Sequence, residues 1–170
     1  MNEDFEELLK LIAELVKKAV IRNFELQGHV MTGDLISTIN YQIISTDIGG
    51  RIDFILNDYG MYQNYGVPAD KIKNPFARPR IEGLTKFAKI KLGISNDKEA
   101  TRVAFAIAKK QSVEGMPTKN SKAMGKKTGA INDALEETNE EIQRLISDAM
   151  DNIITSLISD TLENYTNLIL

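Results

Sequence analysis

The sequence contains no cysteine and a single histidine, and both shortages limit the chemistry that the chain could perform. Without cysteine there are no disulfides, no thiolate nucleophile and no cysteine-ligated zinc site. The histidine, His29, directly follows Gly28 at the end of an amphipathic segment, where a loop or packing role is far more common than catalysis. A metal site would therefore have to be built from carboxylates alone.

Long apolar runs are also missing. The uncharged apolar stretches fall well short of the roughly 20 residues that a bilayer-spanning helix needs. The first twenty residues carry acidic side chains at positions 3, 4, 6 and 7, whereas a signal peptide begins with basic ones. With 42% apolar and 26% charged residues over 170 positions, the chain has the composition of a soluble globular protein and the length of a single domain. We expect it to be made and kept inside a cell, or inside something assembled there.

Motifs for catalysis or nucleotide binding are absent or incomplete. Residues 125–128, Gly-Lys-Lys-Thr, resemble the end of a phosphate-binding loop, but Asn120 stands where that motif needs its first glycine and Lys127 where it needs a hydroxyl. No Gly-x-Ser-x-Gly pattern occurs, and no histidine is available as a conventional base. Four glutamates at 136, 137, 140 and 141 fall on the outer face of a predicted helix, which favours a solvated or partner-facing surface over a metal pair. We expect no enzymatic activity, no cofactor and no metal.

Charge is distributed unevenly along the chain. Residues 1–66 carry 5 basic and 10 acidic side chains, residues 67–127 carry 15 basic and 5 acidic, and residues 128–170 carry 1 basic and 9 acidic. A basic middle between acidic ends has three interpretations. It could bind a polyanion, pair with the acidic helix of a neighbouring copy, or be neutralised within one fold. The sequence leaves all three open.

Amphipathic segments at both ends of the chain are expected to be long helices. Residues 3–26 place apolar side chains at spacings of three and four, with Asn2 as an N-cap candidate and Gly28 as a natural stop. Residues 130–165 repeat this spacing over a longer stretch, which one break near Ser147 or Ser156 could divide.

A β-hairpin is expected at about 39–57, because two alternating, β-branched-rich runs lie on either side of a turn at residues 47–50, Asp-Ile-Gly-Gly. The strands are expected near 39–47 and 50–57. Residues 32–39 indicate a short loop followed by an amphipathic turn or strand entry. Residues 58–66 are compatible with a short helix or an irregular strand.

The rest of the middle is predicted to alternate between arms and helices. Three prolines make residues 67–81 an extended arm. Residues 82–92 and 96–113 are predicted helices, the second with a narrow stripe of small residues that permits close packing. Residues 115–129 contain four lysines and no acid, and we expect a mobile basic loop there. The expected fold is α+β: a small antiparallel sheet packed against the long N-terminal and C-terminal helices, with extended mobile arms.

Three short motifs occur in order within residues 5–80. Residues 32–39 have the sequence Thr-Gly-Asp-Leu-Ile-Ser-Thr-Ile, residues 62–66 have Tyr-Gln-Asn-Tyr-Gly, and residues 75–79 have Pro-Phe-Ala-Arg-Pro. With the amphipathic helix before them and the hairpin between them, these motifs resemble those of the tail-completion and head–tail joining proteins of tailed bacteriophages. Thr38 stands where that family often has serine.

One departure from the family pattern lies downstream of these motifs. Members commonly pass from the Pro-Phe motif almost directly into the last helix, whereas about fifty residues intervene here. An alternative match places the Pro-Phe equivalent at residues 115–118, Gly-Met-Pro-Thr, with the earlier segment as an insertion. Whether 67–81 or 115–129 is the arm that contacts a neighbour therefore stays open.

The resemblance implies a non-enzymatic structural virion protein, made in the bacterial cytoplasm, that forms a ring in the phage neck and joins the portal or head to the tail. The implied partners are copies of the chain in a hexamer or dodecamer, the portal or adaptor ring, and tail proteins; a lumen contact with DNA would be non-specific, and no membrane is involved. The candidate partner-binding residues are Tyr62, Tyr65, Pro75, Phe76, Arg78, Arg80, Lys119, Lys122, Lys126, Lys127, Glu136, Glu137, Glu140 and Glu141.

The alternative function is a nucleic-acid-binding module without sequence preference. Seven basic residues fall within 21 positions, and Glu82 is the only acid among them. No helix-turn-helix, zinc finger or stacked-aromatic platform surrounds them. They are Lys71, Lys73, Arg78, Arg80, Lys86, Lys89 and Lys91.

Overall fold

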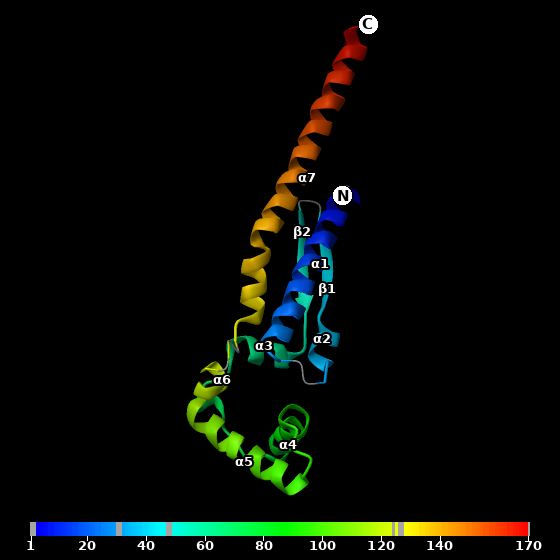
Figure 1. The fold of residues 1–170 in the computed structure, drawn as a ribbon. Coiled ribbons are helices and arrows are strands. Elements are labelled where there is room, and N and C mark those ends of the chain that lie inside the picture. The colour runs from blue at the N-terminus through cyan, green and yellow to red at the C-terminus, as the bar shows by residue number, and fades with distance from the viewer. Residues whose placement is uncertain (1–2, 30–31, 47–48, 124, 126–127, 170) are drawn as a thin grey trace.

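The computed structural model describes residues 3–29, 32–46, 49–123, 125 and 128–169. Helices dominate, and a two-stranded antiparallel sheet accompanies them, which confirms the predicted α+β class (Figure 1). In chain order the elements are α1 (Glu3–Leu26), α2 (Asp34–Thr38), β1 (Asn40–Thr46), β2 (Gly49–Ile55), α3 (Asp58–Tyr65), the 3-10 turn η1 (Ala69–Lys71), α4 (Arg78–Leu92), α5 (Asp97–Glu114), α6 (Lys119–Ala123) and α7 (Ala130–Ile169).

Helix α1 forms the centre of the larger part of the molecule. Its apolar stripe is buried, and Phe24 is fully enclosed. Both strands pack against α1, and α7 runs alongside it (Figure 1). Leu35 and Ile39, from the Thr-Gly-x-Leu motif, complete this core. We call the described residues of 3–65 and 130–145 the hub.

The hairpin has the predicted position, with different ends. Its register runs from Asn40 opposite Ile55 to Thr46 opposite Gly49, so Gly49 and Gly50 belong to the second strand and not to the turn. The first two residues of the expected turn, 47 and 48, lie outside the described residues. A Cβ on Gly50 would lie 2.4 Å from Leu9 Cδ1, so this glycine allows the strand to approach α1 closely.

Short helices occupy the two segments that flank the hairpin. Residues 34–38 form a helical turn, α2, and not a strand entry; Gly33 precedes it with a φ of 83°. The strand predicted to reach residue 57 stops at Ile55, because Asn57 instead caps α3: its side chain accepts a 3.0 Å hydrogen bond from the Tyr59 N–H. Of the two expectations for residues 58–66, the helical one is correct.

Helices α4 and α5 pack on each other as a separate pair below the hub, and Figure 1 shows α4 nearly end-on and α5 from the side. The predicted small-residue stripe is confirmed, since Ala100, Ala104 and Ala108 are all fully buried and let the two helices approach closely. Ile81 and Ala88 from α4 fill the facing positions. This second core is distinct from the core around α1.

The predicted extended arm, 67–81, is too long. Helix α4 already begins at Arg78, four residues earlier than expected, and η1 interrupts the segment before it. Pro79 lies in the first turn of α4, where a missing N–H costs no intrahelical hydrogen bond, so it starts the helix and does not exclude it.

The predicted basic loop, 115–129, is also not irregular throughout. It contains α6, and its first residues pair with the start of the other arm: the Val67 N–H donates to Met116 O and the Met116 N–H donates to Val67 O, both at 2.8 Å. Gly66 and Gly115 flank this bridge with φ of 74° and 82°. The sequence left open whether residues 67–81 or 115–129 contact a neighbour, and in the structure these two segments are joined to each other at this bridge.

Helix α7 is a single helix of 40 residues, about 60 Å long at 1.5 Å per residue. It continues past both serines at which a break was considered and ends four residues later than predicted. Its first half packs on α1, and its second half extends beyond the hub (Figure 1).

Candidate functional site

The described residues offer no enclosed reaction centre. No group of three or more histidine, aspartate or glutamate side chains within them could hold a metal ion. The hollow between α4 and α5 is open to solvent and is lined by Ile81, Glu82, Thr85, Lys86, Lys89 and Thr101. Helices long and apolar enough to cross a membrane are not found in the described part of the chain. The candidate residues named from the sequence are described next by their positions on the surface.

The aromatic candidates lie on two different elements. Tyr62 and Tyr65 project from α3 with 59% and 68% of their surface exposed, as a partner-binding role requires. Phe76 follows Pro75 just before α4, and its ring stacks on Phe105 of α5 with centroids 6.0 Å apart. This contact pins the arm to α5 while leaving half of the Phe76 ring exposed.

The two arginines of the Pro-Phe-x-Arg-Pro motif have different surroundings. Arg78 is exposed and pairs with Glu82 one turn along α4, at 2.8 Å. Arg80 is directed inward: its Nη2 donates to Gln111 Oε1 at 2.7 Å and contacts Met116 Sδ at 3.4 Å. Its Nε is buried without a hydrogen-bond partner. Arg80 therefore links α4, α5 and the second arm within one chain.

The C-terminal glutamates also separate into two groups. Glu137 forms an ion pair with Arg22 and accepts a 3.0 Å hydrogen bond from Asn23, so it joins α7 to α1. Glu141 accepts two hydrogen bonds from Arg144, which lowers the pKa of its carboxyl. Glu136 and Glu140 are exposed and form no ion pair within the described ranges.

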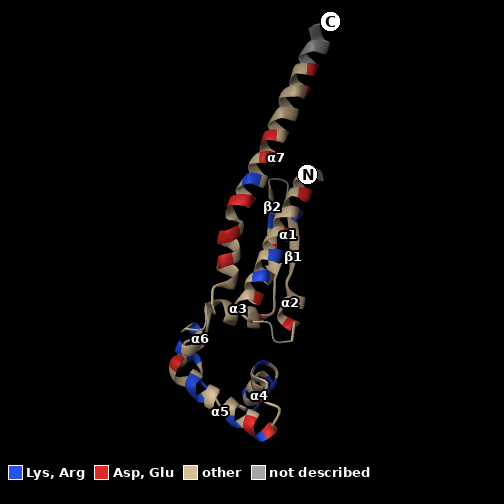
Figure 2. Cartoon of the chain, in the orientation of Figure 1, with Lys and Arg blue, Asp and Glu red and all other residues tan. Residues whose placement is uncertain are grey.

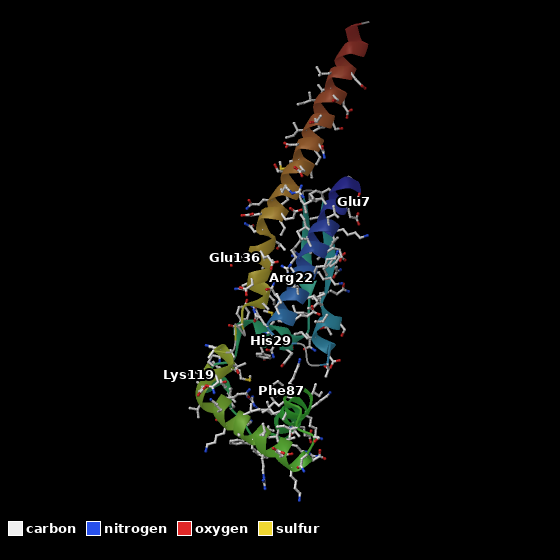
Figure 3. The ribbon with its side chains drawn as sticks, in the orientation of Figure 1. Glu7, Arg22, His29, Phe87, Lys119 and Glu136 are labelled. Carbon is white, nitrogen blue, oxygen red and sulfur yellow. The ribbon has the colours of Figure 1, made fainter. Side chains whose placement is uncertain are left out.

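The lysine candidates are only partly described. Lys119 and Lys122 are exposed on α6, and Figure 3 shows Lys119 at the outer edge of the molecule. Lys126 and Lys127 lie outside the described residues.

One connecting residue was missed by sequence reasoning. Asn64 lies between the two tyrosines of its motif, and it is 2% exposed. Its Oδ1 accepts from the Ile131 N–H at 2.8 Å, its Nδ2 donates to Asn132 at 3.1 Å, and its backbone oxygen accepts from the Gly129 N–H at 2.7 Å. Asn64 therefore satisfies N–H groups at the start of α7 that have no partner inside the helix. All three partners are more than sixty positions away, so no local pattern could reveal this role.

The second half of α7 carries an exposed apolar surface, which we call the distal apolar face. Figure 3 shows the side chains along this part of α7 projecting away from all other elements. Leu157 and Ile158 are 60% and 55% exposed. After Arg144 the described side chains of α7 include four acids, Asp148, Asp151, Asp160 and Glu163, and no base. The distal apolar face consists of Ile146, Met150, Ile153, Ile154, Leu157 and Ile158.

Helix α5 presents a second mixed surface, which we call the outer α5 face. It comprises side chains at spacings of three and four on the side opposite the buried alanines, so they form one stripe. Phe105 and Val113 within it are 46% and 74% exposed. The outer α5 face consists of Lys98, Arg102, Phe105, Lys109 and Val113.

The two surfaces lie at opposite ends of the molecule. Figure 2 shows Lys and Arg gathered on α4, α5 and α6, and Asp and Glu along α7. Within the described ranges, no ion pair joins a base of α4 or α5 to an acid of α7. The described ranges therefore contain no ion pair that would neutralise the bases of α4 and α5 with the acids of α7, and the three interpretations of the charge pattern stay predictions.

The family resemblance rests on short motifs, and comparisons of the whole chain add nothing to it. None of the protein-family models, curated proteins or solved structures compared with the chain matches it.

Proposed function

We propose that the chain is a non-enzymatic structural subunit that assembles with copies of itself into a ring in the neck of a tailed bacteriophage, between the portal and the tail. The observation that carries this proposal is the distal apolar face, which no described element of the chain covers. A contiguous apolar strip on a helix that projects from its hub is typical of a surface that a partner covers.

A ring requires two different surfaces on each copy. A cyclic assembly joins one patch to a different patch on the next copy, whereas a twofold dimer joins a patch to itself. The distal apolar face and the outer α5 face differ in charge and lie far apart (Figure 2). This arrangement favours a head-to-tail interface over a twofold one.

The motif residues support the phage-neck assignment through their places in the hub. Gly33 provides the left-handed turn before α2, and Leu35 and Ile39 are buried against α1. In the tyrosine motif, the Asn64 side chain is buried, whereas the side chains of Tyr62 and Tyr65 are exposed. Two of the three motifs thus belong to the hub, which has an exposed aromatic edge, and the Pro-Phe-x-Arg-Pro motif lies outside the hub at the start of α4.

Genetic removal tests the neck assignment. A phage that lacks the gene should accumulate DNA-filled heads and separate tails, and the wild-type gene supplied in trans should restore joined particles. Electron microscopy of lysates distinguishes the outcomes. Normally joined, infectious particles without the protein would contradict the assignment.

Non-specific nucleic-acid binding is the second candidate, and the exposed lysines of α4 favour it. Lys86 and Lys91 are exposed, while Lys89 pairs with Asp97 at 2.5 Å. Exposed Phe105 and Val113 between the bases of α5 fit a protein partner better, since phosphate contacts need charge and not apolar surface. A salt-dependent shift of duplex DNA that is lost when the three lysines become glutamine would support this second function.

A further inference from the structure

The distal apolar face is short enough to fit along the outer α5 face. The first spans 13 positions of α7, residues 146–158, and the second spans 16 positions of α5, residues 98–113, or about 20 and 24 Å at 1.5 Å per residue. The distal apolar face can therefore pack on α5 over its whole length.

The two faces are complementary in chemistry, and the distal apolar face is the wider of the two. With 100° between successive residues, the outer α5 face covers an arc of about 80° and the distal apolar face an arc of roughly 140°. The first combines bases with apolar side chains, and the second combines apolar side chains with flanking acids. The acids of α5 lie outside the arc of its outer face, so they do not oppose an acidic partner. Those acids are Asp97, Glu99 and Glu114.

We propose that the distal apolar face of one copy docks along the outer α5 face of a second copy, with the acids of α7 next to Lys98, Arg102 and Lys109. This inference rests on the proposed function in one respect, since both require the chain to associate with itself. The inference adds which two surfaces form the contact between copies, and we call this contact the joint. Apolar contact supplies the affinity, and the opposite charges fix the partner and the direction.

Two other occupants of the distal apolar face are less favourable. Pairing of two α7 helices would bring the acids of both copies together with no base beyond Arg144 to offset them. Docking onto the same chain's own α5 is prevented by the fold, because α7 is a continuous helix that leads away from the α4–α5 pair (Figure 1). A second copy has neither obstacle.

The apolar part of the joint is tested by adding charge to the docking side of α7. The variant Ile153→Asp/Leu157→Asp replaces two exposed side chains, so the hub should remain folded. We expect the dissociation constant between copies to rise at least about 100-fold, as when two buried aliphatic side chains are lost from an interface. The matched control, Thr155→Asp/Ser159→Asp, adds the same charge on the opposite side of α7 and should keep the wild-type assembly.

Analytical ultracentrifugation of the full chains measures association, and circular dichroism checks that α7 stays helical in both variants. If the apolar-face variant assembles like wild type, or if both variants dissociate equally, the proposed joint is wrong.

The charged part of the joint is tested by reversal and rescue. Asp151→Lys/Asp160→Lys and Lys98→Glu/Lys109→Glu should each weaken association, and the chain carrying all four changes should recover it. Glu6→Lys/Glu25→Lys makes the same charge change at exposed positions of α1, outside the joint, and should have no effect. A four-fold variant no better than the two-fold ones would overturn the pairing of these faces.

The outcome for wild type separates the two proposals. A wild-type ring that tolerates every one of these changes leaves the proposed function standing and refutes the α7–α5 joint. A wild-type chain that stays monomeric refutes both.

Discussion

Asn64 connects the tyrosine motif to the start of α7 through three hydrogen bonds. An amide is the side chain that fits, because one atom must accept from a backbone N–H while the other donates to Asn132. The motif therefore has a structural role between its two exposed tyrosines.

We predict that Asn64→Ala lowers the free energy of unfolding by about 1–2 kcal/mol, because the Ile131 N–H at the start of α7 loses its acceptor and Asn132 Oδ1 loses its donor. Urea denaturation followed by circular dichroism measures the change. Asn64→Asp keeps an acceptor and should lose less, and Tyr65→Ala, at an exposed neighbour, should lose little. An alanine variant as stable as wild type would show that the cap is dispensable.

Gly66 provides a second prediction about a single residue. Its φ is 74°, and a Cβ there would lie 2.4 Å from Met116 O, so Gly66→Ala should destabilise the fold by at least about 1–2 kcal/mol. Gly83 is within α4 and a Cβ there has open space, so Gly83→Ala should stabilise by about 0.5–1 kcal/mol. Thermal unfolding compares the two, and shifts of equal sign would contradict the geometry of the bridge.

Tyr41 provides a prediction on pH. Its hydroxyl donates to Glu14 at 2.8 Å, and this bond to a carboxylate raises the tyrosine pKa above its usual value near 10. Because the folded state raises this pKa, the contribution of the Tyr41 hydroxyl to folding stability is complete at pH values below the pKa of the unfolded chain. That contribution is lost as the pH rises through the Tyr41 pKa of the folded state. NMR titration of the tyrosine rings should therefore place Tyr41 above pH 10 in wild type and closer to 10 in Glu14→Gln. An unchanged Tyr41 pKa in that variant would contradict the assigned cause.

At the scale of elements, periodicity predicted the helices and misjudged the connections. The spacing of three and four located α1, α5 and α7, because an amphipathic helix repeats its burial every turn. The prolines of residues 67–81 favoured an arm, yet Pro79 starts α4. Apolar side chains recur at the same spacing along the whole of α7, so the sequence could not show that only the first half of this helix packs on α1.

The candidate surfaces were predictable in part. Local composition located the basic middle and the acidic C-terminal helix. It could not show that Glu137 and Arg80 have partners within the chain, since those partners, Arg22, Asn23 and Gln111, are between 31 and 115 positions away. Nonlocal contacts leave no signal in the spacing of one segment.

The α4–α5 pair yields a prediction of its own. Ala104 is fully buried at the contact between the two helices, so Ala104→Leu should overpack it at a cost of roughly 1–3 kcal/mol. Hydrogen exchange should show faster exchange in α4 and α5 and unchanged exchange in α1, because the two cores are distinct. Ala106→Leu, on the exposed side of α5, is the control and should leave exchange as in wild type.

At the scale of the whole molecule, the chain has three parts: the hub, the basic α4–α5 pair at one end and the apolar, acidic half of α7 at the other (Figures 1 and 2). Separation of unlike surfaces is the property that lets one chain join two neighbours. The hub lies between these two ends (Figure 1).

The central claim is that this chain assembles into a closed ring, and native mass spectrometry of the purified full chain over a range of concentrations tests it most directly. We predict one discrete oligomer larger than a dimer, whose size stays constant as concentration rises. Monomers at every concentration, or twofold dimers alone, would contradict the claim.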